Sequence, residues 1–142
     1  MMIETDILYA FVKKSDWLKP TADKLMWMIN GDKFGDVFAS REALHELYYV
    51  SVEEGVPIDE LITRVAALTS IGNLTFLPTT TAIDLLALTI VKQYRLTSIF
   101  DAFHAATALN QVSDHTIAST DDVFDRVPGL KRVDPRTLVE TE

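Results

Sequence analysis

The segment Ser98-Ile99-Phe100-Asp101-Ala102-Phe103-His104-Ala105-Ala106-Thr107-Ala108 carries an acidic residue at the start of an alanine-rich stretch. We expect residues 102–109 to form a helix whose small alanine side chains let it approach a sheet closely. A carboxylate at such a boundary is costly to remove from water unless it caps the helix, meets a cation or stays hydrated. Asp101 is therefore either a helix cap or a functional residue, and the segment alone supports both interpretations.

Three further acidic residues, Asp6, Glu46 and Asp121, lie at similar boundaries between apolar runs and helix starts or strand ends. Glu46 could be a solvated helix residue, with Glu42 one turn earlier as an equal candidate. Asp121 could simply form a turn. Asp6, which closely follows Glu4, is harder to explain by structure alone. Four such acids, spread over nearly the whole chain, suggest a fold that gathers them into one acidic, metal-binding cleft.

The composition is that of a globular domain: 142 residues, 48% hydrophobic and 24% charged. We expect a single domain over residues 1–142, with residues 135–142 as a flexible C-terminal tail. The absence of cysteine excludes a disulfide scaffold and a thiolate metal site. No apolar stretch is long enough to cross a membrane, and residues 1–4 do not resemble an export signal, so we expect a cytoplasmic protein.

The formal net charge of −8 argues against a protein that holds nucleic acid through a broad basic surface. It does not exclude a nuclease whose acids are concentrated at a cation site, because bound divalent ions reverse the local field.

Strand-like runs and helix-like spacings alternate along the chain. We predict strands at 1–3, 37–39, 74–77, 116–118 and 130–133, helices at 7–11, 15–29, 41–52, 57–68, 81–94 and 102–109, and a helical turn at 122–126. This alternation predicts an α/β layer fold with a mostly parallel sheet of four or five strands flanked by helices. Ligands bind beyond the carboxyl ends of the strands in such sheets, which is where the acids are expected.

Oxygen-only ligands favour hard cations, so the cleft would hold Mg²⁺ or Mn²⁺ rather than zinc or copper. With one or two such ions, the carboxylates could activate water and stabilise the oxyanions of a phosphodiester under attack. His45, His104 and His115 have no recognisable metal-ligand spacing, and we expect each to be a surface or partly buried histidine. The aromatic residues Trp17, Trp27, Tyr48 and Tyr49 are expected in the core or at an interface.

Four segments, taken in order, resemble the motifs of the PIN-domain family, which includes the VapC-type toxins of toxin–antitoxin pairs. They are Glu4-Thr5-Asp6-Ile7-Leu8, residues 40–47, residues 101–108 and residues 119–130. The resemblance extends from Glu4 to Asp134. Its most specific part is the Asp-Ala-x-His-Ala-Ala-x-Ala segment that begins at Asp101.

The resemblance implies a PIN-like three-layer sandwich and a Mg²⁺- or Mn²⁺-dependent ribonuclease. Such proteins act on RNA, are commonly homodimers and are often inhibited by a co-encoded antitoxin. Glu46, Asp101 and Asp121 match the family's helix acid, third acid and late acid. Ser119 matches a small hydroxyl residue that orients the late acid.

The first motif departs from the family pattern, because Glu4 occupies a position where the family usually has aspartate, and Asp6 occupies the third position. Residues two apart on an extended segment point to the same side. Either acid could therefore ligate the metal, with the other in support.

Two rival functions remain to be compared with the nuclease. Phosphatases of the haloacid-dehalogenase type also begin with a strand, an acid, any residue and an aspartate, but their nucleophile is the first aspartate, which Glu4 replaces here. A PIN-like scaffold that binds RNA or protein with little hydrolysis is the more serious rival.

We therefore interpret the chain as a divalent-metal-dependent endoribonuclease, the toxin half of a toxin–antitoxin pair. The predicted catalytic residues are Asp6, Glu46, Asp101 and Asp121. The same four acids and Glu4 are predicted to hold the metal, with Ser119 in support. The apolar faces of the early helices could support a homodimer.

Overall fold

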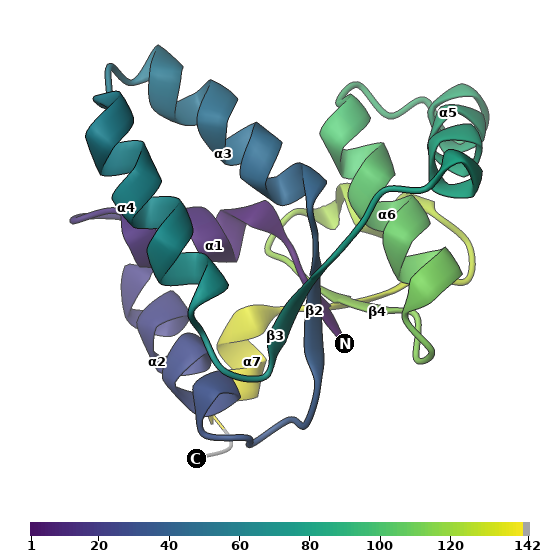
Figure 1. Ribbon diagram of the computed structural model, residues 1–142. Helices are drawn as coiled ribbons and strands as arrows, with labels where there is room; N and C mark the ends of the chain where they lie inside the picture. Colours follow the sequence, from purple (N-terminus) through teal and green to yellow (C-terminus); the bar gives the residue numbers. More distant parts are fainter. Residues whose placement is uncertain (141–142) are drawn as a thin grey trace.

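A five-stranded parallel sheet lies at the centre of the computed structural model, which describes residues 1–140 (Figure 1). The strand order is β3-β2-β1-β4-β5, and every neighbouring pair is parallel. The strands are β1 (Met2–Ile3), β2 (Val37–Ser40), β3 (Leu74–Leu77), β4 (Thr116–Ala118) and β5 (Lys131–Val133). The predicted sheet is confirmed, and it is wholly rather than mostly parallel.

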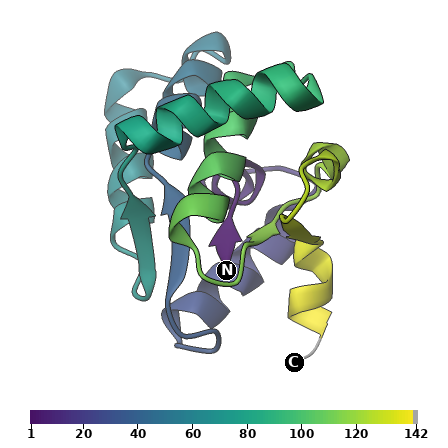
Figure 2. The ribbon, with the colours of Figure 1, turned by 90° about the vertical axis from the view of Figure 1, so that its right-hand side faces the viewer.

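Helices cover both faces of this sheet (Figures 1 and 2). They are α1 (Thr5–Val12), α2 (Lys19–Asn30), α3 (Glu42–Glu53), α4 (Ile58–Thr69), α5 (Thr81–Tyr94), α6 (Ile99–Gln111) and α7 (Pro135–Glu140), with a short 3₁₀ helix, η1 (Asp122–Arg126). Helix α3 contacts both α1 and α6, so it connects the two helical layers at one end of the molecule.

Neighbouring residues within a strand face opposite layers, as the period of an extended chain requires. Ile3 packs into the core formed with α1, α2 and α4, whereas Met2 packs into the core formed with α5 and α6. In β4, Ala118 likewise packs into the first of these cores and Ile117 into the second. Two hydrophobic cores separated by one sheet make the three-layer α/β sandwich that was expected.

Helix α6 lies close to the sheet because its inner face is built from small residues. Ala102, Ala105, Ala106 and Ala108 are all fully buried, and the helix contacts α5, β2 and β4. It begins at Ile99 rather than at residue 102, because Ser98 caps it by accepting a hydrogen bond from the backbone N–H of Asp101 at 3.4 Å. Asp101 therefore lies in the first turn of the helix and does not cap it.

The expectation of a flexible tail is wrong for residues 135–140, which form α7 against α2. Pro135 is buried, and Leu138 and Val139 pack against the core on that side of the sheet. The apolar pair gives this short helix a surface to bury, which a solvated tail would lack. Residues 141 and 142, which the expectation also covered, lie outside the described residues.

Two of the aromatic residues expected in the core or at an interface, Trp17 and Trp27, are about two-thirds exposed, at 68% and 67%. Within residues 1–140, no helix has the length and apolar character that a membrane span requires.

Replacing buried Ala106 with leucine should destabilise the protein, because the added methylene groups must displace neighbours in a packed layer. We expect Ala106→Leu to lower the free energy of unfolding by about 1–3 kcal/mol. Urea denaturation measures the effect. The matched control is Ala67→Leu at an exposed position of α4, which should change stability by less than about 0.5 kcal/mol. Equal effects of the two substitutions would show that α6 does not pack as described.

Candidate metal centre

The neighbouring strands β1 and β4 end beside each other, at the point in the sheet where the strand order reverses. From β1 the chain passes to β2 and β3 on one side, and it returns to β4 and β5 on the other. Glu4 follows β1 and donates its backbone N–H to the carbonyl of Ala118, the last residue of β4, at 3.1 Å. Parallel α/β sheets bind ligands beyond the carboxyl ends of their strands at such a reversal.

Glu4 connects the ends of both strands through its side chain. It is only 5% exposed, and it caps α1 by accepting the backbone N–H of Asp6 at its Oε2, at 2.9 Å. The hydroxyl of Ser119 donates to Oε1 of Glu4, also at 2.9 Å. Ser119 in turn accepts the backbone N–H of Asp121 at 3.0 Å. The Ser119 hydroxyl thus donates its proton to Glu4 and, through its oxygen, holds the backbone of Asp121 in place.

Asp6 lies in the first turn of α1, so the premise that Glu4 and Asp6 share one extended segment is wrong. The helix starts at Thr5 because Glu4 caps it. Oδ2 of Asp6 accepts two hydrogen bonds from Thr120, from the backbone N–H at 2.9 Å and from the hydroxyl at 2.7 Å. Its other oxygen, Oδ1, is buried and has no hydrogen-bond partner.

The remaining acids approach from three other elements. Asp101 lies in the first turn of α6, and Glu46 lies in the second turn of α3. Asp121 caps η1 by accepting the backbone N–H of Val123 at 2.9 Å. The turn-forming role considered for Asp121 is therefore real, and it coexists with a place beside the other acids.

All five predicted acids line one cleft of about 210 Å³. The complete lining is Glu4, Thr5, Asp6, Tyr9, Glu46, Val50, Asp101 and Asp121. Glu42, the alternative to Glu46, lies elsewhere, with its carboxylate bonded to His45 and Thr79. The fold thus brings together acids that lie more than a hundred positions apart in the chain.

Residues 1–130 match the family model of the PIN domain. The chain belongs to the PIN-domain family. The crystal structure of Mycobacterium tuberculosis VapC20, a sarcin-ricin loop cleaving toxin, has the same fold with a TM-score of 0.70 and 18% sequence identity. The alignment covers 87% of this chain and 92% of that chain. No curated protein matches the sequence.

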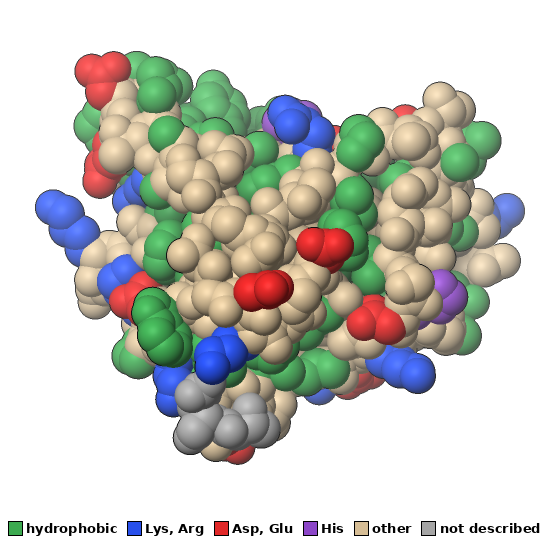
Figure 3. Space-filling model, turned by 60° about the horizontal axis from the view of Figure 1, so that its bottom comes forward, with side chains coloured by type: hydrophobic (Ala, Val, Ile, Leu, Met, Phe, Trp, Pro, Cys, Tyr) green, Lys and Arg blue, Asp and Glu red, His purple; other side chains and the backbone are tan. Residues whose placement is uncertain are grey.

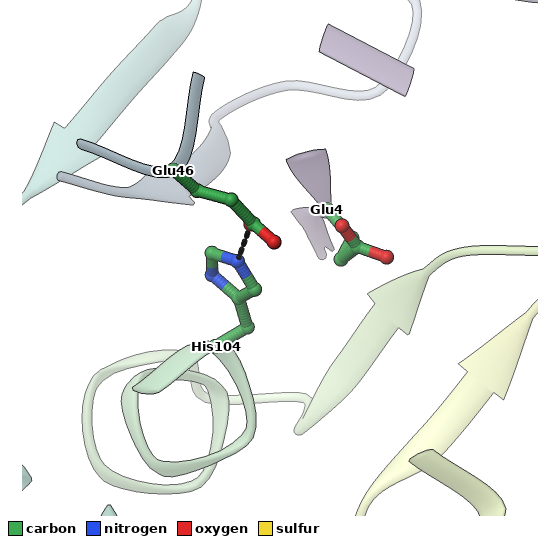
Figure 4. A group of neighbouring side chains, drawn as sticks. All are labelled: Glu4, Glu46 and His104. Carbon is green, nitrogen blue, oxygen red and sulfur yellow. Dashed lines mark hydrogen bonds and ion pairs between the residues drawn. The ribbon is translucent and has the colours of Figure 1, made fainter. Parts of the chain in front are cut away.

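This PIN domain contains a site residue whose place the sequence analysis did not foresee. His104 is fully buried, and its Nε2 lies 2.9 Å from Oε1 of Glu46 (Figure 4). The same nitrogen lies 2.9 Å from the hydroxyl oxygen of Thr5. The signal was its position three residues after Asp101, since residues three apart on a helix share a face. Glu4, Glu46 and His104 each offer a ligand atom within 4.8 Å of the others.

The electrostatics of the cleft reflect carboxylates that are withdrawn from water and crowded together. Burial, followed by the charges of Asp6 and Glu46, raises the pKa of Glu4 well above its ordinary value. Burial also raises the pKa of Asp6, against the hydrogen bonds from Thr120. Burial and then the charge of Glu46 raise the pKa of Asp101 to about 6.

Glu46 differs from these acids. Burial alone would raise its pKa, but the hydrogen bond and electrostatic attraction of His104, helped by the Thr5 hydroxyl, outweigh that effect and lower it. Glu46 therefore stays ionised more readily than Glu4, Asp6 or Asp101, whose pKa values burial raises.

The donor set fits a divalent cation. The five carboxylates supply hard oxygen ligands, and a cation would relieve the repulsion between their negative charges. A bound cation would also give the buried Oδ1 of Asp6 the partner that it lacks.

The metal-free protein should lose stability as the pH rises through the titration of Asp101. The folded protein holds this proton up to a pKa of about 6, compared with the ordinary 3.8. The stability that the protonated Asp101 gives the folded protein is therefore fully present below the ordinary pKa of 3.8, and it is lost as the pH rises through about 6. Asp101→Asn should remove this loss, which solvent screening of the half-buried carboxylate limits to about 1 kcal/mol.

Urea denaturation in EDTA at about pH 4 and about pH 7 measures this difference. Relative to the wild type, Asp101→Asn should be more stable at the higher pH than at the lower one. The control is Asp59→Asn, which removes one charge from an exposed position on α4. If Asp101→Asn differed from the wild type in free energy of unfolding by the same amount at both pH values, the prediction would be contradicted.

Proposed function

We propose that the protein is a divalent-metal-dependent endoribonuclease that hydrolyses phosphodiester bonds of RNA in the acidic cleft. The observation that carries the proposal is the convergence of five acids beyond the carboxyl ends of β1 and β4. Membership in a family of nucleases supports the same reaction class. The structural likeness to an RNA-cleaving toxin supports it at the level of the fold.

Asp6, Glu46, Asp101 and Asp121 would hold Mg²⁺ or Mn²⁺, together with Glu4. Both oxygens of Glu4 already accept a hydrogen bond, yet each keeps a lone pair for a cation. Bound ions would supply positive charge to the phosphodiester and lower the pKa of a coordinated water.

Neighbouring polar residues hold the carboxylates of the cleft in position. Thr120 fixes Asp6 through two hydrogen bonds, and Ser119 fixes Glu4 and the backbone of Asp121. These contacts hold the carboxylates before any substrate arrives, which lowers the cost of organising the site during the reaction. No cleft residue with a clear role as general acid stands out among those that the structure describes.

The charge of the protein shapes how RNA would bind. With a net charge of −8 it offers RNA little general attraction. On the face shown in Figure 3, Lys and Arg side chains are scattered rather than gathered into one broad patch. Recognition would therefore depend on cations in the cleft and on local contacts.

The toxin role of VapC20 suggests the same role here, with a protein antitoxin as the partner. Helices α3 and α4 offer exposed apolar side chains for association, among them Tyr48, Ile58 and Ile62. These three residues help to line an apolar hollow of about 430 Å³ between the two helices. Large exposed apolar surfaces commonly mark protein interfaces.

The activity test is cleavage of RNA with Mn²⁺ or Mg²⁺. We expect cleavage by the wild type, its abolition by EDTA, and a loss of roughly 10²-fold or more in Asp101→Asn, on the scale of removing one group that stabilises a transition state. The exposed-site control, Asp59→Asn, should cleave like the wild type.

Cleavage that survives both EDTA and Asp101→Asn would sink the metal mechanism. Folded protein that cleaves none of the RNAs supplied would favour the alternative of a binding scaffold. Trapping of an aspartyl-phosphate would revive the phosphatase alternative, which membership in the PIN-domain family makes the weakest of the three.

The proposed homodimer predicts a mass in solution of twice the 15.9 kDa of one chain. Burial of exposed apolar side chains would drive the association. Light scattering over a range of concentrations measures the mass. A monomer mass that does not change with concentration would count against the dimer.

A further inference from the structure

His104 joins three helices at one atom. It lies on α6, one turn after Asp101, and its Nε2 meets Glu46 on α3 and Thr5, the first residue of α1. The imidazole is fully buried, and Thr5 is only 5% exposed. A buried polar group of this kind needs an explanation beyond packing, because an apolar side chain would fill the same space without desolvation.

The hydrogen bond to Glu46 determines where the imidazole proton is. An ionised carboxylate can only accept hydrogen bonds, so Nε2 of His104 must donate to Oε1 of Glu46. The other ring nitrogen, Nδ1, is buried without a partner. Moving the proton from Nε2 to Nδ1 would break the bond to Glu46 and leave a buried N–H without an acceptor.

This arrangement separates two possible roles for His104 in the group that it forms with Glu4 and Glu46. A ring nitrogen that carries a proton has no lone pair for a cation. Nε2 is therefore not a metal ligand in this geometry. Nδ1 faces a buried environment and not the cleft, whose lining does not include His104.

We propose that His104 is a positioning residue that holds Oε1 of Glu46 and thereby directs the other carboxylate oxygen into the cleft. Figure 4 shows that second oxygen on the side of Glu4. The proposal rests on the proposed function for its catalytic consequence, whereas the geometry that carries it is independent of RNA cleavage.

The physical effect is preorganisation. A glutamate side chain loses conformational entropy when it is fixed in one rotamer. The bond from His104, together with the neighbouring Thr5 hydroxyl, makes this ordering part of folding rather than of cation binding. Partners that hold a ligating carboxylate in this way typically contribute 10–100-fold to metal affinity.

Glutamine and asparagine make a matched pair of replacements. The amide nitrogen of glutamine can reach the place of Nε2, whereas that of the shorter asparagine lies near the place of Nδ1. We expect His104→Gln to bind Mn²⁺ within a few-fold of the wild type and His104→Asn to bind it about 10–100-fold more weakly. Calorimetric titration of the protein with Mn²⁺ measures both, and circular dichroism confirms that each variant is folded.

The wild-type protein gives a second measurement that needs no substitution. Nitrogen-15 NMR of the histidine rings distinguishes a protonated ring nitrogen from a bare one. We expect Nε2 of His104 to be the protonated nitrogen both in EDTA and after addition of Mg²⁺. Loss of that proton on Mg²⁺ binding would overturn the proposal and make His104 a ligand.

Equal Mn²⁺ affinity in the Gln and Asn variants would also overturn the proposal, because it would show that the donor at the Nε2 position does not matter. Neither measurement requires RNA cleavage. A protein without nuclease activity that still passes both tests would refute the proposed function and leave the role of His104 standing.

Discussion

The hydrogen bond from Ser119 to Glu4 is the contact on which the arrangement of the cleft depends. It joins the ends of β1 and β4, the two strands at the point where the sheet order reverses. Glu4 also starts α1, and Ser119 also holds the backbone of Asp121. One buried side-chain pair thus sets the start of a helix, the spacing of two strand ends and the place of a third acid.

The sequence was sufficient for the fold and for the membership of the acidic cleft. Apolar runs and turn residues marked β1 to β4, as expected for a parallel sheet covered on both faces. The edge strand β5 (Lys131–Val133) is more polar and more exposed. The roles of His104 and Thr120 could not be predicted, since each depends on a partner that the fold supplies from about sixty or more positions away. The place of Asp6 was misjudged for a local reason: because Glu4 caps the helix, α1 starts at Thr5, two residues before the apolar run that begins at Ile7.

The cleft gathers negative charge at a cost that the rest of the domain must offset. Burial raises the pKa of Glu4, Asp6 and Asp101, so their ionised forms oppose folding when no cation is present. Two complete hydrophobic cores, one on each face of the sheet, supply the favourable free energy. Functional sites are commonly the places where local stability is sacrificed in this way.

The residues that line the cleft, 4–6, 9, 46, 50, 101 and 121, span most of the chain. β4 must pair with β1, a contact between residues more than a hundred positions apart, before Ser119 can reach Glu4. Such long-range pairing forms late, because the entropy of closing the intervening chain has to be overcome first. A nascent chain on the ribosome therefore carries no complete site until the segment that contains β4 has emerged. The topology itself delays the appearance of any activity until synthesis of the domain is nearly finished.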